Sequence, residues 1–187
     1  LALDANGYVW AWGHGSWGGL TGIGYNESHW DPGMVVGGET GSPYLKAKAI
    51  SAGQGFSMAV TIDGKAVAWG NNGDSGTDPS GGNLGNGTDA GSLTPVYIRT
   101  AANSPITNVI NISDGDTWGF LTRTDNTIWT WGNNTLGFLG IGSTTGWLEL
   151  TSILVATILT SFSLKSRAKI IPGSPLKPSG PPKVGIL

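Results

Sequence analysis

The chain of 187 residues has no cysteine and few charged side chains. Without thiols it has no disulfide framework, no thiolate metal site and no cysteine nucleophile. Charged residues make up 12% of the sequence, against about 25% in an average globular protein. Because disordered chains combine high charge with low hydrophobicity, this composition indicates a folded protein. No stretch before residue 150 has a helical hydrophobic period of useful length, which favours strands.

Glycine and tryptophan are abundant, with 32 and nine copies, and this suggests packed strands joined by tight loops. The charge is divided unevenly along the chain. Residues 1–150 contain twelve acidic and five basic side chains, a net charge of −7, whereas residues 151–187 contain five basic side chains and no acid. We therefore predict a repeat region at 1–150 and a separate hydrophobic, basic and proline-rich tail at 151–187. The negative repeat region repels phosphate, so no nucleic-acid partner is expected.

Three similar segments lie at residues 1–24, 56–87 and 118–142. Each contains a strand, a tight turn, a second strand that ends in Trp-Gly, and a glycine-rich loop. The structural anchors of the repeat are Trp12, Gly13, Trp69, Gly70, Trp131 and Gly132, with the turn residues Asp63 and Gly64. The tryptophans are 57 and 62 residues apart, and a period of roughly fifty residues is typical of propellers and solenoids.

Two turn-forming residues separate the strands of each segment: Asn6-Gly7, Asp63-Gly64 and Asp125-Asn126. This pattern predicts a hairpin with a two-residue type I′ turn, whose central positions both require positive φ. Counting outward from the turn places Val60 opposite Val67, and Met58 opposite Trp69. The equivalent predicted pairs are Leu3–Trp10, Leu1–Trp12, Thr122–Trp129 and Phe120–Trp131.

Both faces of each predicted hairpin carry apolar or small residues, so neighbouring sheets are expected to stack on both sides. Further short strands are expected at 35–36, 47–52, 95–98 and 109–112, with Leu20, Leu84 and Leu139 filling the edges of the sheets. Radially packed blades satisfy this requirement. The predicted fold class is all-β, a partial β-propeller of about three blades of four-stranded antiparallel sheet, with an irregular C-terminal tail.

The second segment contains Ala49-Ile50-Ser51-Ala52-Gly53, Phe56-Ser57-Met58-Ala59-Val60, Asp63-Gly64, Trp69-Gly70-Asn71, Leu84-Gly85-Asn86-Gly87 and Thr94-Pro95-Val96. In this order the motifs resemble the repeat of the regulator of chromosome condensation family, and the resemblance recurs in register over residues 1–142. Phe56 stands where the family has histidine, and the loop from 72 to 84 is longer. The resemblance implies a seven-bladed propeller, so the three copies are expected to be a fragment that lacks further blades of a parent ring.

The tail allows three interpretations. Residues 147–164 are mostly apolar or hydroxylated and are followed by basic residues, so a membrane anchor could form, with membrane contact limited to 147–169. Alternatively, one or two β-branched strands pack on the last blade. The third interpretation is a degenerate terminus. From Pro172 onward the proline content predicts an extended chain.

No catalytic residue, cofactor or metal site is expected from the motifs. The sequence from Gly13 to Gly18 matches the G-x-G-x-x-G dinucleotide pattern, but no helix follows it to bind the pyrophosphate. His14 and His29, expected in loops, are the only imidazoles and have no partners at ligand spacing. The aspartates and asparagines of the glycine-rich loops match no calcium-loop pattern, and turn formation explains them.

Exposed aromatic residues are the best candidates for a binding site. Trp17 and Trp30 are expected in loops at the rim of the propeller, and tryptophan is enriched at interaction hot spots. With His14 and His29 they form the predicted partner-binding set.

The first functional hypothesis is a non-catalytic scaffold that binds a protein partner through its rim loops. The resemblance implies family roles that range from nucleotide exchange on a nuclear small GTPase to secreted bacterial inhibitors and surface proteins. The composition favours an extracellular or cell-surface location. One alternative is a structural or surface-anchored repeat module with the tail as its membrane or partner anchor. Another is a carbohydrate-active enzyme, which would need paired carboxylates in the central channel.

Overall fold

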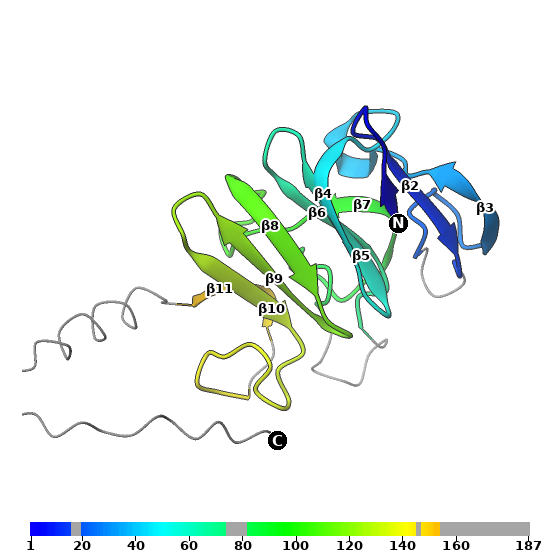
Figure 1. Cartoon of the computed structure of the whole chain (residues 1–187). Helices are drawn as coiled ribbons and strands as arrows, with labels where there is room; N and C mark the ends of the chain where they lie inside the picture. Colours follow the sequence, from blue (N-terminus) through cyan, green and yellow to red (C-terminus); the bar gives the residue numbers. More distant parts are fainter. Residues whose placement is uncertain (16–19, 74–81, 145–146, 154–187) are drawn as a thin grey trace, which may run out of the picture. The chain divides into compact units, whose positions relative to one another are not determined.

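The computed structural model describes residues 1–15, 20–73, 82–144 and 147–153. They form three antiparallel sheets that follow one another along the chain, coloured blue, cyan to green, and green to orange in Figure 1. This described part has no α-helix and contains one short 3-10 helix, η1 (Gly38–Thr40). The predicted all-β class and partial propeller are confirmed.

Each sheet is a meander in which neighbouring strands are consecutive in sequence. Sheet 1 consists of β1 (Ala2–Leu3), β2 (Val9–Gly13) and β3 (His29–Met34). Sheet 2 consists of β4 (Ala47–Ala52), β5 (Phe56–Thr61), β6 (Ala66–Gly70) and β7 (Ser92–Tyr97). Sheet 3 consists of β8 (Val109–Asp114), β9 (Trp118–Arg123), β10 (Ile128–Gly132) and β11 (Trp147–Ile153). The strand expected at 35–36 is only an isolated bridge between Val36 and Tyr44, directly after β3.

The hairpin loops have three residues rather than the predicted two. The Thr61 amide donates to the Lys65 carbonyl (2.8 Å) and the Gly64 amide donates to the Thr61 carbonyl (2.9 Å), which leaves residues 62–64 as the loop. Only the last loop residue is left-handed, with φ of +81° at Gly64, +82° at Gly7 and +63° at Asn126. Since a type I′ turn needs positive φ at both central residues, the predicted turn is wrong in all three repeats.

The additional loop residue shifts the strand register by one position. Trp69 lies opposite Ser57 instead of Met58, and Val60 lies opposite Ala66 instead of Val67. The predicted Leu1–Trp12 pair does not form, because the pairing of β1 begins at Ala2. The corrected pairs in the other repeats are Leu3–Val9, Ala2–Trp10, Thr122–Ile128, Leu121–Trp129, Phe120–Thr130 and Gly119–Trp131.

The two faces of sheet 2 contribute to two different hydrophobic cores, because opposite residues of an antiparallel pair point to the same face. One core joins the face of sheet 2 that carries Val67 and Trp69 to Val9 and Ala11 of sheet 1. The other joins the opposite face of sheet 2 to sheet 3. Its members are Phe56, Met58, Val60, Ala66, Ala68, Leu84, Ile98, Ile106, Val109, Ile112, Leu121 and Trp131. The sheets therefore stack on both sides, as predicted.

A tryptophan crosses each contact between successive sheets, which we call a seam. Trp69 Nε1 donates to the Leu20 carbonyl (3.1 Å), and Trp131 Nε1 donates to the Asn83 carbonyl (2.8 Å). The ring lies directly on a glycine of the preceding repeat: a Cβ added at Gly22 would be 2.5 Å from Trp69 Nε1, and one added at Gly85 would be 2.9 Å from the Trp131 ring. Each seam thus needs the tryptophan of one repeat and the glycine of the repeat before it.

The residue directly before that glycine fills the edge of each sheet. Leu84 and Leu139 are fully buried, as the sequence predicted. In the first repeat this position is Thr21, which is 2% exposed, while Leu20 is only half-buried. The prediction for Leu20 is wrong by one residue, because Gly22 and not Thr21 aligns with Gly85.

A buried asparagine orders the glycine-rich loop in the second and third repeats. Asn72 Oδ1 accepts a hydrogen bond from the Leu84 amide (2.7 Å), and Asn134 Oδ1 accepts one from the Leu139 amide (3.0 Å). Both side chains are fully buried. Each asparagine lies three residues after the seam tryptophan, and Gly15 occupies this position in the first repeat.

The predicted tail begins inside a strand. Residues 147–153 form β11, which pairs with β10, so this part matches the strand interpretation. The remainder of the proposed anchor, 154–169, and the proline-rich end lie outside the described residues, and the boundary at 150 stays a prediction. In the part of the chain that the structure describes, no helix is long and apolar enough to span a membrane.

Candidate functional site

Three of the four residues predicted to bind a partner lie at one end of sheet 1. Gly13 of β2 pairs with His29 of β3, so His14, which follows Gly13, lies at the same end of the sheet as His29 and Trp30. Trp30 was expected in a loop but belongs to β3, the edge strand of sheet 1. Trp17 lies outside the described residues.

Trp30 is 93% exposed, the highest value among the large hydrophobic side chains of the described residues. A tryptophan so exposed buries almost none of its apolar surface, so it adds little to the stability of the sheet. The next residue of β3, Asp31, is exposed as well. A large apolar side chain left in contact with water is typical of an interaction surface.

His29 is held by an aromatic neighbour rather than exposed in a loop as predicted. The Tyr25 ring lies 5.0 Å from it, centroid to centroid, at an interplanar angle of 59°. His29 Nε2 is buried and has no hydrogen-bond partner in the described part of the chain. Tyr25 is 45% exposed and adds a second exposed aromatic side chain through its contact with His29. The sequence analysis did not select Tyr25, although its place four residues before His29 could have suggested it.

Apart from the histidines, the charged side chains of residues 1–45 have one sign. Residues 1–45 contain four acidic side chains, Asp4, Glu27, Asp31 and Glu39, and no lysine or arginine. Glu27 and Asp31 are exposed. We name Tyr25, Glu27, His29, Trp30 and Asp31 the Trp30 surface. Its aromatic and acidic side chains complement a partner that combines apolar and basic groups.

The opposite end of the sheets has a cavity of about 290 Å³ between the loop after β3 and the hairpin of sheet 2. Its two cations already have partners: Lys65 Nζ lies 2.8 Å from Asp63 Oδ2, and Lys46 Nζ lies 4.5 Å from the Tyr8 ring centroid. The residues that line the cavity are Thr40, Ser42, Lys46, Thr61, Ile62, Asp63, Lys65 and Tyr97.

Hydrogen bonds hold the carboxylates of the hairpins in their charged form. The bond from Lys65 and then the bond from the Thr61 hydroxyl lower the pKa of Asp63, and the same ion pair raises the pKa of Lys65. Asp125, which accepts from the Thr127 hydroxyl and amide, also has a lowered pKa. A general acid at neutral pH needs a raised pKa, so these groups serve as turn-forming residues.

Asp114 has the opposite shift. Burial raises its pKa, although Ser51 Oγ donates to Asp114 Oδ1 (2.6 Å) and partly offsets the effect. Asp114 Oδ2 is buried without a hydrogen-bond partner in the described residues. The bond joins β8 of sheet 3 to β4 of sheet 2, and a Cβ at Gly53 would lie 3.1 Å from Asp114 Oδ2. Asp114 therefore connects two sheets.

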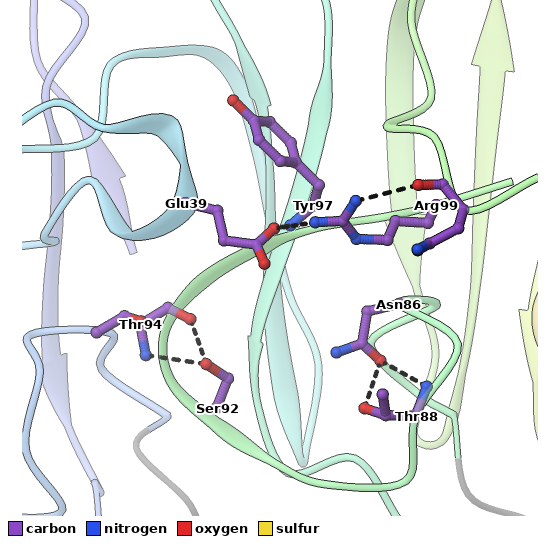
Figure 2. Close-up of polar contacts among 8 residues, drawn as sticks. Glu39, Asn86, Thr88, Ser92, Thr94, Tyr97 and Arg99 are labelled. Atoms are coloured by element: carbon purple, nitrogen blue, oxygen red, sulfur yellow. Dashed lines mark hydrogen bonds and ion pairs between the residues drawn. The ribbon is translucent and has the colours of Figure 1, made fainter.

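A second polar contact joins sheets 1 and 2 (Figure 2). Glu39 of η1 accepts from the Tyr97 amide and from Arg99 Nη2, both at 2.8 Å. The Tyr97 amide lies on β7, the edge strand of sheet 2, so Glu39 occupies a donor that the sheet leaves unpaired. Arg99 Nη1 also donates to the Asn103 carbonyl (3.3 Å). No group of three or more histidine, aspartate or glutamate side chains able to hold a metal occurs among the described residues.

Comparisons with known proteins agree with this architecture. Residues 47–75 match the family described as regulator of chromosome condensation (RCC1) repeat. The human E3 ubiquitin-protein ligase HERC2 is 29% identical over 134 residues, which are 72% of this chain and 2% of HERC2.

Two solved structures share the fold. Human WBSCR16 has a TM-score of 0.63 at 20% identity, covering 83% of this chain and 35% of that protein. Yeast RCC1 (Prp20), solved with Kap60 bound, has a TM-score of 0.59 at 19% identity, covering 81% and 32%. The chain spans only a small part of HERC2 and about a third of each solved protein.

Proposed function

We propose that this chain, whose residues 47–75 match the regulator of chromosome condensation repeat and which shares the fold of yeast RCC1, is a non-catalytic scaffold that binds a protein partner through the Trp30 surface. The observation that carries the proposal is the 93% exposure of Trp30 on β3, which pairs with β2. Pairing within the sheet limits the backbone freedom that is lost when a partner binds. Yeast RCC1, which shares the fold, binds the protein Kap60.

The acidic side chains indicate the chemistry of the partner. Glu27 and Asp31 flank His29 and Trp30 in the sequence, and residues 1–45 contain no lysine or arginine. The partner therefore presents a basic segment with an apolar residue that packs on Trp30. Electrostatic attraction of this kind accelerates association and weakens as salt is added. The extracellular location expected from composition stays a prediction.

The test compares immobilised wild-type chain with the Trp30→Ala variant in capture of proteins from a lysate of the source cells. We expect recovery of the partner to fall about tenfold or more, the effect of losing a hot-spot tryptophan. Ile62→Ala is the matched control, because Ile62 is 65% exposed but lies in the hairpin loop of sheet 2. Equal recovery on all three chains would exclude the Trp30 surface.

A salt series on the captured partner tests the electrostatic part separately. Recovery on the wild-type chain should decrease as ionic strength rises, and Asp31→Asn should reduce that dependence. The Trp30→Ala loss should persist at every salt concentration, because it removes apolar contact. Recovery that is independent of salt would contradict a basic partner while leaving the aromatic anchor in place.

A further inference from the structure

Three asparagines of this chain are followed directly by glycine: Asn6, Asn72 and Asn86. Such a pair can rearrange, because the glycine amide nitrogen can attack the carbonyl carbon of the asparagine side chain and expel ammonia. The reaction needs an accessible amide nitrogen, a side chain folded over the next peptide bond and donors that stabilise negative charge on Oδ1. The structure places the three asparagines in different surroundings, so these requirements can be compared.

The side chain of Asn86 folds back over the peptide bond that follows it. Its Oδ1 accepts from the Thr88 amide (3.1 Å), which closes an Asx turn around Gly87. The Thr88 hydroxyl also donates to Oδ1 (3.0 Å), and Figure 2 shows both bonds. The ring closed by the first bond contains Asn86 Cγ and the Gly87 nitrogen. The two reacting atoms are therefore held in one small ring.

Three donors converge on Asn86 Oδ1. Besides the two from Thr88, Asn72 Nδ2 donates to it (3.2 Å). Attack on Cγ places negative charge on this oxygen, and donors already directed at it stabilise that charge. Asn86 Nδ2, which must leave, has no hydrogen-bond partner among the described residues. The donors thus hold the oxygen that gains charge and not the nitrogen that departs.

The attacking nitrogen is accessible only at Gly87. In the described part of the chain the Gly87 amide donates to no group, and the space where a Cβ would lie is open. The amides of the other two glycines are engaged. Gly7 donates to the Asp4 carbonyl (3.0 Å), and Gly73 donates to Asn71 Oδ1 (2.8 Å). Asn86 is therefore the one asparagine of the three that meets all the requirements.

The loop does not need an amide side chain at position 86. Ile23 and Ile141 occupy the equivalent position in the other two repeats, directly after the glycines that correspond to Gly85. An apolar side chain is therefore compatible with this loop, and the hydrogen bonds of Asn86 are a property of the second repeat alone.

We propose that Asn86 is a site of spontaneous deamidation that the fold itself promotes. The Gly87 nitrogen bonds to Asn86 Cγ and loses its proton to water. The bond from Cγ to Nδ2 breaks, and ammonia leaves with a proton taken from water. A water molecule then opens the resulting succinimide at either carbonyl, which gives aspartate or isoaspartate. The net reaction consumes one water and releases one ammonia.

The two products differ in their effect on the fold. Aspartate at position 86 keeps the three donors, and a carboxylate accepts hydrogen bonds more strongly than an amide does. Isoaspartate adds a methylene group to the main chain directly after Gly85, the glycine on which Trp131 packs. The second product therefore alters the seam between sheets 2 and 3.

The first test incubates the folded full-length chain at mildly alkaline pH and measures deamidation at each Asn-Gly pair by mass spectrometry of peptides prepared at acidic pH. The chain unfolded in urea provides the intrinsic rate of each pair. We expect folding to slow Asn6 and Asn72, so that Asn86 reacts about tenfold faster or more than either. If Asn86 reacts no faster than Asn6 in the folded chain, the proposal is wrong.

Asn133 is the matched control within the same sample. Its Oδ1 accepts from the Thr135 amide and hydroxyl, both at 2.9 Å, as that of Asn86 accepts from Thr88. The next residue is Asn134 instead of glycine, and its side chain hinders ring closure. We expect Asn133 to react much more slowly than Asn86. Equal rates would contradict the role given to the Gly87 amide.

Two variants of Thr88 test whether the donors activate Asn86. Thr88→Val removes the hydroxyl and keeps the shape, so deamidation at Asn86 should slow about tenfold, since one donor to the developing charge is lost. Thr88→Ser keeps the hydroxyl and should react as wild type does. Far-UV circular dichroism verifies that both fold, and Asn6 provides the internal standard. An unchanged or faster reaction in Thr88→Val, or equal slowing in both variants, would overturn the proposal.

Discussion

At the scale of single residues, the buried asparagine of the glycine-rich loop forms hydrogen bonds with several backbone groups at once. Asn72 Nδ2 donates to the carbonyls of Thr88 (2.7 Å) and Ala90 (3.0 Å), while its Oδ1 accepts from the Leu84 amide. One side chain thereby pairs three backbone groups of a loop that has no strand partner. Buried backbone groups need such partners, because an unpaired one costs about as much as a lost hydrogen bond.

We predict that Asn72→Ala lowers the free energy of unfolding by about 2–4 kcal/mol, since it leaves several buried groups unpaired. The matched control is Asn71→Ala, because among the described residues Asn71 Oδ1 accepts from the Gly73 amide alone (2.8 Å), in a local turn. That variant should lose about 1 kcal/mol or less. Urea denaturation of both variants provides the comparison. Equal losses would show that the buried hydrogen bonds of Asn72 stabilise the fold no more than the single hydrogen bond of Asn71.

At the scale of elements, each hairpin depends on one left-handed residue. Asn126 occupies in the third repeat the position that glycine occupies in the other two. A Cβ at Gly64 would have its nearest neighbour at 3.7 Å, so the position has room and only the backbone conformation restricts it. A substitution at Gly64 therefore tests the backbone conformation without a steric clash of the new side chain.

We predict that Gly64→Ala costs about 1–2 kcal/mol of stability, because alanine is strained in the left-handed region. Asn126→Gly should change stability by less than about 1 kcal/mol, since asparagine tolerates that region. Thermal or urea unfolding measures both. A loss at Asn126 as large as that at Gly64 would mean that side-chain contacts, rather than φ, determine the loop.

The hairpins also show how far sequence reasoning extends. Alternation and the Trp-Gly ends located β5, β6, β9 and β10 correctly, because strand composition is set by burial on both faces. Loop length was wrong because Asx-Gly occurs both in two-residue turns and as the last two residues of three-residue loops. In the first repeat, Asp4 lies directly before the loop and accepts from the Asn6 (2.8 Å) and Tyr8 (2.9 Å) amides. Only the backbone hydrogen bonds of the structure show at which residue the loop begins.

The candidate site itself stays a prediction. Trp30 was selected because it falls outside the predicted strand pairs, and its side chain is exposed. Its strand was missed because β3 contains Pro32 and Gly33, which weaken a strand pattern. An edge strand tolerates proline, since one side of it forms no ladder. Tyr25 was missed because its relation to His29 is a contact between side chains, which spacing does not specify.

At the scale of the whole molecule, four carboxylates with shifted pKa values fall into two groups with opposite effects on acid stability. Hydrogen bonds lower the pKa of Asp4, Asp63 and Asp125, so these groups stabilise the fold above their ordinary pKa of 3.8, and that stability is lost as pH falls through their lowered values. Asp114 has a raised pKa. Between 3.8 and that raised value its folded state binds more protons, so Asp114 makes stability decrease as pH rises.

We predict that Asp114→Asn removes this decrease. The amide oxygen can still accept from Ser51, and no charge is buried at any pH. The free energy of unfolding of the variant minus that of wild type should increase as pH rises from 3.8 through the mildly acidic range, and then level off. Urea titrations at a series of pH values measure this difference. A difference that does not vary with pH would mean that the Asp114 carboxylate keeps its ordinary pKa.

The division of each seam between two repeats has a consequence for how the chain can change in length. The tryptophan belongs to one unit and the glycine it covers belongs to the unit before, so every unit ends with what the next one requires. Duplicating or deleting a complete unit leaves each remaining junction chemically intact, whereas a cut within a unit separates the two halves of a junction. Proteins whose repeats contact only their neighbours gain and lose whole repeats in this manner. In this chain, the exchange of repeats depends on one tryptophan indole and on the absence of a side chain at the glycine that it covers.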